Sequence, residues 1–527
     1  MSNFHGLELA KRALFAQQHA LYTTGHNIAN ANTKGYTRQR VNFEADTALP
    51  TAAKNRFGTP YQIGTGVKGG SIERIRNRFL DLQFRGENSL AGYWEKRADA
   101  LGRMENVLND LNETGLSKVM DDFWSSLQDL AVNPTNSGAR SVVVQRGIAL
   151  GETFDYLNGQ LSQIRSDLKE EVTTTTRDIN LILENINELN KQIKSLEING
   201  YTPNDLYDAR DNLIDELSAI VPIEVDYQNS RKNHIDDPEP EYGGKGMDGV
   251  AMVYLKTTNP DGATENILLV DGIGLDYAEL ELIGGEANGR DYFSGLIVEM
   301  GGEQRQIGFL EGDGLIVEEE KGTLQSLVEA YGYLEEGEVT GDIIKMQQAL
   351  KDMAYHFSNA FNELHRSGNP LEESPVEPND FFVFEEDETN PDSWSLNVAS
   401  HIANNPSYIA ASLPDEELGD GSLAFELAKL FDEDLEGLDG KSIRDFYAER
   451  ISGLAVDLSN AERMEQNTSV LITQLENNRQ SVSSVSLDEE MTNLIKFQHA
   501  YNAAARTMTA TDELIDRIIN HMGLAGR

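Results

Sequence analysis

The sequence predicts a mainly α-helical, rod-like protein with a small β-rich domain inserted into it. Three observations predict this fold class. Near both ends of the 527-residue chain, apolar residues recur every seven positions, which is typical of a coiled coil. Long interior stretches alternate apolar spacings of three and four, as bundled helices do. Between residues 228 and 340, glycines and short alternating strands replace the helical pattern.

The two ends of the chain carry one-sided apolar stripes. The N-terminal stripe comprises Leu7, Leu14, Leu21 and Ile28, and the C-terminal stripe comprises Leu487, Leu494, Tyr501, Met508, Ile515 and Met522. A second C-terminal row is expected four residues further on, from Met491 to Ile519. Neither stripe has a core nearby in sequence, so the simplest partner of each is the other. We therefore expect residues 1–45 and 486–527 to form one terminal coiled-coil domain.

Capping signals accompany both terminal helices. Ser486 and Glu489 form a capping box that starts the C-terminal helix. The N-terminal helix is expected to end in the run NIANANTKGYTRQR, from Asn27 to Arg40. Asn and Thr side chains cap backbone groups, and Gly35 supplies the left-handed turn that follows a helix. A plain helix stop explains this run, and a contact with a second chain is the alternative.

The helical body is predicted to cover residues 46–227 and 341–485. Its longest stripe runs from Leu150 to Leu196, with an extra four-residue step at Val172 that is typical of a coiled-coil stutter. Asn199 and Gly200 stop this helix, and Pro203 starts the next one. Further stripes run from Ile343 to Leu364 and from Tyr447 to Leu475. These patterns predict long bundled helices.

The predicted insert, residues 228–340, contains the alternating runs VAMVYL, YAELELI, GLIVEM and GLIVEEE. Alternation with a period of two predicts half-buried strands, so we expect a small β domain here. Residues 371–440 differ again, with 19 acidic residues and Lys429 as the single basic one. We expect short elements joined by loops in that segment.

Charge and composition narrow the classes of function. The net charge is −44, although residues 1–100 hold 14 Lys and Arg against 8 Asp and Glu. A strongly acidic body argues against nucleic acid as a partner, because phosphate binding needs a broad basic face. The chain has no cysteine, so thiolate metal sites and disulfides are excluded. No apolar run is long enough to span a bilayer, and no classical signal peptide is visible.

Sequence motifs for catalysis are weak. The run GTGVKG, Gly64 to Gly69, matches a dinucleotide-binding pattern but lacks the strand and helix around it, so a turn is expected. The run DEDLEGLDGKSI begins like a calcium loop, but its twelfth residue is Ile443, not a glutamate. No two histidines have the spacing of a helical zinc site. We expect no cofactor, no metal and no enzymatic activity; an enzyme such as a wall hydrolase in the acidic insert is the alternative.

Both ends of the chain resemble the axial proteins of the bacterial flagellum, which include rod, hook and hook-associated proteins. The likeness rests on NIANANTKGYTRQR, with Asn27, Asn30, Asn32, Gly35 and Tyr36 as its signature residues, and on the tail SLDEEMTNLIKFQHAYNAAARTMTATDELIDRIINHM. Interior runs such as NDLYDARDNLIDELSAIVPIEV and SLNVASHIANNPSYIAAS are similar to hook-associated proteins of the first junction between hook and filament. Another axial protein, such as the second junction protein, is the alternative.

The resemblance implies a layered, non-enzymatic subunit of a homopolymer. It implies that both termini form an inner domain lining the axial channel, that the helical body forms the next layer, and that the insert faces outward. It also implies export from the cytoplasm by the flagellum-specific type III apparatus, helped by an export chaperone, and a final place outside the cell. Hook protein and the second junction protein are the implied neighbours, with no nucleic acid and no membrane as partner.

Overall fold

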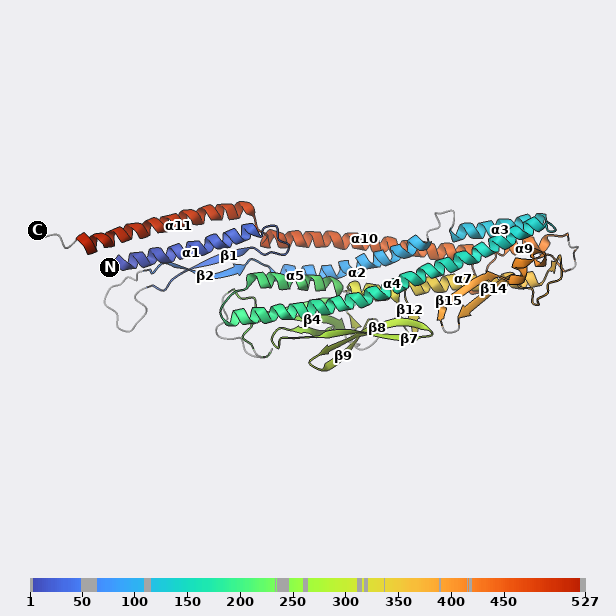
Figure 1. The fold of residues 1–527 in the computed structure, drawn as a ribbon, viewed down its shortest axis with the longest axis horizontal. Helices are drawn as coiled ribbons and strands as arrows, with labels where there is room; N and C mark the ends of the chain where they lie inside the picture. The colour runs from blue at the N-terminus through green and yellow to red at the C-terminus, as the bar shows by residue number, and fades with distance from the viewer. Residues whose placement is uncertain are drawn as a thin grey trace.

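The computed structural model describes residues 3–48, 64–108, 115–232, 234, 246–258, 264–309, 315–316, 321–335, 337–387, 390–414, 416 and 419–521. Figure 1 shows an elongated molecule in which long helices run nearly parallel to the long axis, with both termini at one end. The helices are α1 (Asn3–Ala29), α2 (Arg78–Leu108), α3 (Leu116–Val132), α4 (Ser137–Ile198), α5 (Asn204–Ile220), α6 (Thr323–Tyr331), α7 (Asp342–Arg366), α8 (Ser400–Asn404), α9 (Ser422–Lys429), α10 (Ile443–Ser483) and α11 (Leu487–Asp516).

Helix α4 is the backbone of the rod. Its 62 residues span about 90 Å at 1.5 Å per residue. The helix is continuous through the predicted stutter at Val172, and the Val172 side chain is fully buried. The helix stops where the sequence predicts: Asn199 is the C-cap, Gly200 takes a φ of 86°, and α5 begins directly after Pro203.

An eight-stranded sheet covers one face of α4 (Figure 1). Its strand order is β6-β5-β4-β10-β9-β8-β7, and β3 also pairs with β4. The strands are β3 (Ile223–Gln228), β4 (Val250–Thr258), β5 (Thr264–Asp271), β6 (Asp276–Tyr277), β7 (Glu279–Ala287), β8 (Arg290–Met300), β9 (Glu303–Gly308) and β10 (Leu315–Ile316). Short two-stranded pairs elsewhere are β1 (Gln39–Ala45) with β2 (Val67–Arg74), β11 (Tyr333–Glu335) with β12 (Glu338–Thr340), β13 (Asn369–Pro370) with β16 (Ala410–Ser412), and β14 (Phe382–Asp387) with β15 (Asn390–Val398).

Two asparagines of α4 fasten the sheet to the rod. Asn180 donates to the carbonyl of Leu280 at 2.8 Å and accepts from its N–H at 2.8 Å. Asn190 makes the same pair of bonds with Ala251, at 2.9 and 3.0 Å. Each amide therefore satisfies one N–H and one C=O of a strand, as a neighbouring strand would.

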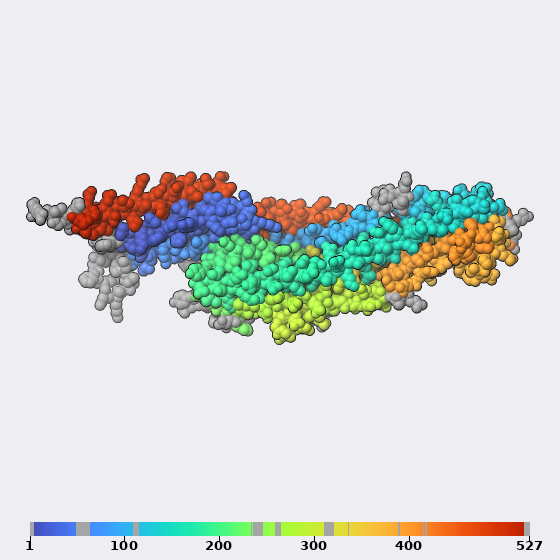
Figure 2. All heavy atoms as spheres, in the orientation of Figure 1, coloured from blue at the N-terminus to red at the C-terminus, as the bar shows by residue number. Residues whose placement is uncertain are grey.

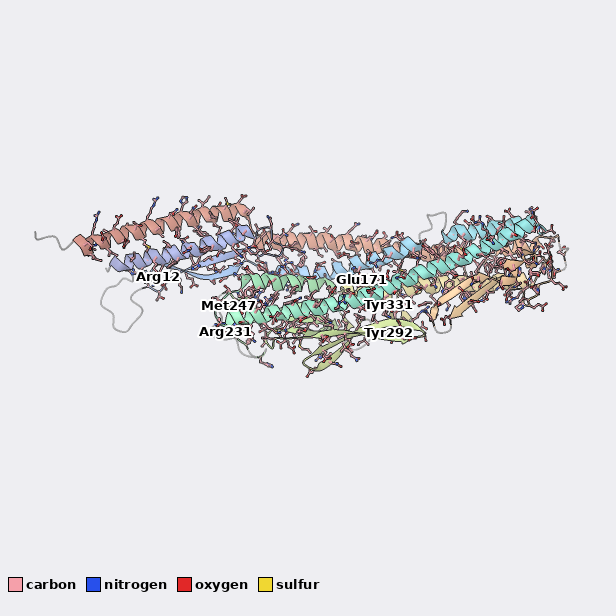
Figure 3. All side chains as sticks on the ribbon, in the orientation of Figure 1. Arg12, Glu171, Arg231, Met247, Tyr292 and Tyr331 are labelled. Atoms are coloured by element: carbon pink, nitrogen blue, oxygen red, sulfur yellow. The ribbon has the colours of Figure 1, made fainter. Side chains whose placement is uncertain are left out.

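The boundaries predicted for the β insert cut through packed structure. The sheet begins with β3, where Ile223 pairs with Leu255, so the segment that was assigned to the rod up to residue 227 already contributes a strand. Helix α6 lies inside the range 228–340 but packs against α2, α4 and α7. Tyr331, at its end, lies between α4 and the sheet (Figure 3), with the Arg165 guanidinium 5.0 Å from its ring centre. The sheet and the helices share one continuous hydrophobic core.

The end of the rod farthest from the termini has an aromatic core with a buried histidine. Phe361 and Phe381 contact the His365 ring. His365 Nδ1–H donates to the carbonyl of Asn379 at 2.8 Å, and Nε2 accepts from the Ala410 N–H at 2.9 Å. The bond that Nε2 accepts requires the neutral ring, and burial lowers the pKa of His365 to about 4.

We expect this histidine to make the rod sensitive to acid. Its folded pKa lies below the ordinary value of 6.5, so the unfolded chain binds the proton first as the pH falls from about 6.5 to about 4. The free energy of unfolding should drop by about 3 kcal/mol over that range from this group alone. Denaturant unfolding at pH 7 and pH 4.5 measures the drop. His365→Gln cannot be protonated and should show a smaller drop, and an equal drop in both proteins would contradict the assignment.

Candidate functional site

The two terminal helices lie side by side along the length of α1 (Figures 1 and 2). The fully buried residues of α1 are small or polar: Ala10, Ala16, Ala20, Thr23, Thr24 and Asn27. The predicted seam residues Leu7, Leu14, Leu21 and Ile28 are each partly buried. Small side chains on α1 allow a close approach to α11. Helix α1 also contacts the β1–β2 pair, where Leu9 lies against Gly66 beside β2 and Arg12 is paired with Asp46 at the end of β1 (Figure 3).

Helix α11 turns a heptad row toward α1, with one difference from the predicted spacing. Leu494, Tyr501 and Ile515 are partly buried, Met508 is 36% exposed and Leu487 is half exposed; Met522 lies outside the described residues. The predicted second row, four residues further on, is wrong in this chain, since Met491 and Ile519 are 52% and 68% exposed. The inward row lies three residues on instead, and it consists of Glu490, Phe497, Ala504 and Thr511. Polar Glu490 and Thr511 hid this row from a search for apolar periodicity.

Asn27 joins three elements at the end of α1. Its side-chain N–H groups donate to the carbonyl of Gln39 at 2.8 Å and to Glu490 Oε2 at 3.1 Å. Its Oδ1 accepts from the Gln39 N–H at 3.0 Å and from the Tyr36 hydroxyl at 2.8 Å. Asn27 is fully buried, and all its hydrogen-bonding capacity is used. One side chain therefore fixes the end of α1, the start of β1 and the start of α11.

Around Asn27, charged and hydroxyl groups complete the cluster. Arg38 pairs with Glu490 at 2.9 Å and with Glu489 at 2.5 Å. Burial raises the pKa of Tyr36, and the carboxylates of Asp205, Asp208 and Glu490 raise it further. The Tyr36 hydroxyl therefore keeps its proton and remains a donor to Asn27.

The rest of the signature run turns toward α5. Gly35 has a φ of 76°, and a Cβ at this position would overlap the side-chain amide of Asn212. The Thr37 N–H donates to Asp208 Oδ2 at 3.0 Å, and Gln39 donates to Asp205 at 3.0 Å. Asn30 caps locally, donating to the His26 carbonyl at 3.1 Å, and Asn32 is exposed. The run is therefore more than a helix stop, because its residues also contact α5.

A largely buried cluster of arginines and aspartates surrounds α5, next to the run from Asn27 to Arg40. Asp208, Asp211 and Asp215 follow one face of α5, at spacings of three and four. Arg74 contacts Asp208 at 2.7 Å and Asp211 at 3.0 Å, and it also pairs with Asp248. The remaining contacts are Arg76 with Asp81 at 2.7 Å and Asp211 at 3.0 Å, Arg85 with Asp215 at 2.8 Å, and Arg479 with Asp81 at 3.1 Å and Asp215 at 2.7 Å.

Asp211 is at the centre of the cluster. Burial alone would raise its pKa, but Arg76, Arg74, Arg210 and Arg85 together hold the pKa well below its ordinary value. These arginines therefore favour the charged form of Asp211. Asp208 differs, because burial raises its pKa against the opposing effect of Arg74. The cluster connects β2, α2, α5 and α10 through ion pairs whose side chains are at most 15% exposed, apart from Asp248 at 29%.

Sequence reasoning missed this cluster. The run DARDNLID, residues 208–215, places its aspartates three and four apart, and RIRNR, residues 74–78, alternates basic residues. Those spacings indicate an acidic helix face and a basic strand end. Nothing in the sequence indicates that this helix face and this strand end contact each other.

The residues of GTGVKG lie at the start of β2, where Thr65 donates to the Thr47 carbonyl at 2.8 Å. In the part of the chain that the structure describes, no cluster of His, Cys, Asp or Glu could hold a metal ion.

Comparison with known proteins gives the family. Family models match at residues 7–37 (flagella basal body rod protein), 101–237 (flagellar hook-associated protein FlgK helical domain) and 477–521 (flagellar basal body rod FlgEFG protein, C-terminal). The chain is 41% identical over its full length to flagellar hook-associated protein 1 of Bacillus subtilis, whose full length is also covered. The chain belongs to the flagellar hook-associated protein 1 family.

Two further proteins with this similarity have lower identity to this chain. The Escherichia coli protein is 24% identical over 97% of this chain and 98% of its own. The solved structure of the flagellar hook junction protein FlgK from Burkholderia pseudomallei has the same fold, with a TM-score of 0.53 and 13% identity over 76% of this chain and all of its own. As a family member, this chain is a structural part of the bacterial flagellum. None of its described helices is long and apolar enough to cross a membrane.

The three matched segments of this hook-associated protein meet at the cluster. Thr37, from the first segment, bonds to Asp208 of the second, and Arg479 of the third bonds to Asp215 of the second. Segments separated by hundreds of residues are thus joined through side chains of α5. This joint, together with the paired terminal helices, is the candidate assembly site.

We expect Gly35→Ala to loosen the terminal helices. The left-handed φ costs an alanine about 1–2 kcal/mol, and Asn212 must move as well. Hydrogen exchange of α1 amides should show a lower opening free energy. The double variant Gly35→Ala/Asn212→Ala removes the overlap but keeps the φ cost, so it should recover part of the loss. Unchanged exchange in both variants would show that Gly35 packs less closely than described.

Asn27→Asp tests the hydrogen-bonded cluster. The carboxylate loses the donor to Gln39 and faces Glu490, so the terminal pair should be destabilised by about 2–3 kcal/mol. Glu490→Gln in the same chain restores a donor–acceptor pair and should return part of that loss. Asn32→Asp, an exposed change in the same run, should stay within about 0.5 kcal/mol. Limited proteolysis of α1 gives the ranking, and equal effects at positions 27 and 32 would refute the role of Asn27.

Proposed function

We propose that copies of this chain form a ring or short helical layer at the junction of hook and filament, on which the filament is built. The observation that carries this proposal is that the paired terminal helices leave apolar side chains exposed. In the single chain, α11 exposes the apolar side chains of Leu487, Met491 and Ile495, which are spaced four residues apart and form one row. A row of exposed apolar residues on a long helix is typical of a surface that is covered in an assembly.

The distribution of charge also supports an assembly surface on the terminal helices. Residues 1–48 and 486–527 together hold nine basic and nine acidic residues, so the whole net charge of −44 lies on residues 49–485. Neutral terminal segments can pack densely around an axis, whereas the acidic rods of neighbouring copies repel one another. In our proposal the terminal domain, residues 1–45 and 486–527, lines the axial channel and the rod lies outside it. The seam residues from Leu7 to Ile28 and from Leu487 to Met522 keep each pair of helices together.

The proposal includes a route and partners. The chain would leave the cytoplasm unfolded through the flagellar type III apparatus, with an export chaperone, and would then contact hook protein on one side and the second junction protein on the other. A chain without cysteine suits such passage, because no disulfide can form on the way. We propose no enzymatic role. In the acidic segment, the buried carboxylate of Asp392 is held by Arg165 at 2.8 Å and Arg290 at 2.7 Å, as in a structural ion pair.

Ile495→Asp tests the proposed assembly surface. Ile495 is 51% exposed, so the change should leave the thermal unfolding of the purified monomer within about 0.5 kcal/mol. In the assembly the carboxylate would be buried without a partner, at a cost of several kcal/mol. Cells with this variant should build hooks, lose their filaments and release flagellin into the medium, while still exporting the variant itself.

Val142→Asp is the matched control. Val142 is a similarly exposed aliphatic residue, 48% exposed, and lies on α4 at the other end of the rod. Cells with this change should swim normally. Full filaments and normal swimming with an exported Ile495→Asp protein would refute the proposed surface.

A further inference from the structure

Helix α10 carries two heptad stripes, and the chain itself covers one of them. The covered stripe faces α2: Arg479 lies over the Phe84 ring at 4.2 Å, and Tyr447 donates to the Leu108 carbonyl at 3.3 Å. Its members are buried or partly buried: Ala461, Glu465, Thr468, Ile472, Leu475 and Arg479. The second stripe, which we call the amide stripe, consists of exposed residues with the same spacing of four and three: Asn467, Leu471, Gln474, Asn478 and Ser481.

The amide stripe lies in the least charged part of an acidic rod. Of the 22 residues from 466 to 487, only Glu476 and Arg479 are charged, and their charges are opposite. A quarter of the whole chain is charged, so about five charges would be expected there. Thirteen of these residues are Asn, Gln, Ser or Thr. Val470 and Leu471, 67% and 45% exposed, add apolar surface.

We propose that the amide stripe is a second helix-packing face, which a helix from the rod of a neighbouring copy of this chain covers. This inference rests on the proposed function, because it needs copies arranged around an axis. Heptad spacing is the pattern that a packed helix requires, and Asn or Gln at such positions fixes the register of the partner helix.

Charge points to a second copy as the occupant. Two rods that each carry the full negative charge of the molecule repel wherever carboxylates face each other, and an uncharged strip removes that repulsion locally. The stripe also ends next to the exposed apolar residues Leu487, Met491 and Ile495 at the start of α11. A neighbouring copy that covers the terminal helices can therefore continue along α10.

The absence of native cysteine allows a direct test. Gln474→Cys and Asn478→Cys place a thiol in the amide stripe, and Thr473→Cys and Asn477→Cys place one on exposed positions beside it. Each thiol is modified with a benzophenone maleimide in isolated flagella and irradiated, and products are mapped by mass spectrometry. Positions 474 and 478 should give crosslinks between two copies of this chain at least fivefold more often than positions 473 and 477.

A second measurement does not depend on the bulky probe. The free thiols at 474 and 478 should react with N-ethylmaleimide at least tenfold more slowly in flagella than in the monomer, while those at 473 and 477 should change little. Equal protection at all four positions, or crosslinks from 478 to a different protein, would overturn the proposal.

Ile495→Cys separates this inference from the proposed function. Crosslinks between copies at 495, together with free thiols at 474 and 478, would refute the amide stripe and leave the junction ring intact. Absence of crosslinks between copies at 495 as well would refute both.

Discussion

The ion pairs around Asp211 decide how the terminal helices leave the rod. Burying charged groups is costly, and four arginines compensate for that cost only if each lies within reach of a carboxylate. Such a cluster therefore contributes little net stability compared with apolar packing, but it tolerates few alternative geometries. The direction of β2, the first turns of α2 and the end of α10 are all fixed by aspartates of α5.

The hydrogen bonds of Asn27 extend this constraint from the rod to the termini. The α1–α11 contact is lined by repeating rows of apolar and small residues, and a shift by one repeat would bring similar side chains together again. Asn27, Glu490 and Arg38 sit at one end of the seam, where polar groups must match to avoid burial without partners. A single polar anchor in an otherwise uniform helix pair sets the register of the whole contact.

Local signals in the sequence predicted much of the fold. The continuous stripe of α4, the stop at Asn199 and Gly200, and the capping box at Ser486, whose hydroxyl faces the Glu489 N–H at 3.5 Å, are all present. The pairing of the terminal helices followed from two stripes that lacked any other partner. Prediction failed where polar groups carry the structure: Glu490 occupies an inward position, and the aspartates of α5 pair with arginines 130 to 264 residues away. Pairings of this kind depend on tertiary geometry, which periodicity does not contain. The same reason explains why periodicity does not reveal that β3 pairs with β4, or that α6 packs against α2, α4 and α7.

The acidic residues and the exposed apolar residues of the terminal helices lie on different parts of this molecule. The rod holds its sheet and distal core through a shared hydrophobic core and through amides such as Asn180 and Asn190, so its surface is free to carry the acidic residues. The terminal segments are electrically neutral and leave apolar side chains exposed. Screening by salt is strong between exposed charges and weak inside a buried cluster. Repulsion between rods therefore depends on the solution, whereas the angle between rod and terminal helices, fixed by buried pairs, does not. A subunit built this way keeps its shape constant while its surface charge limits where a second copy can approach.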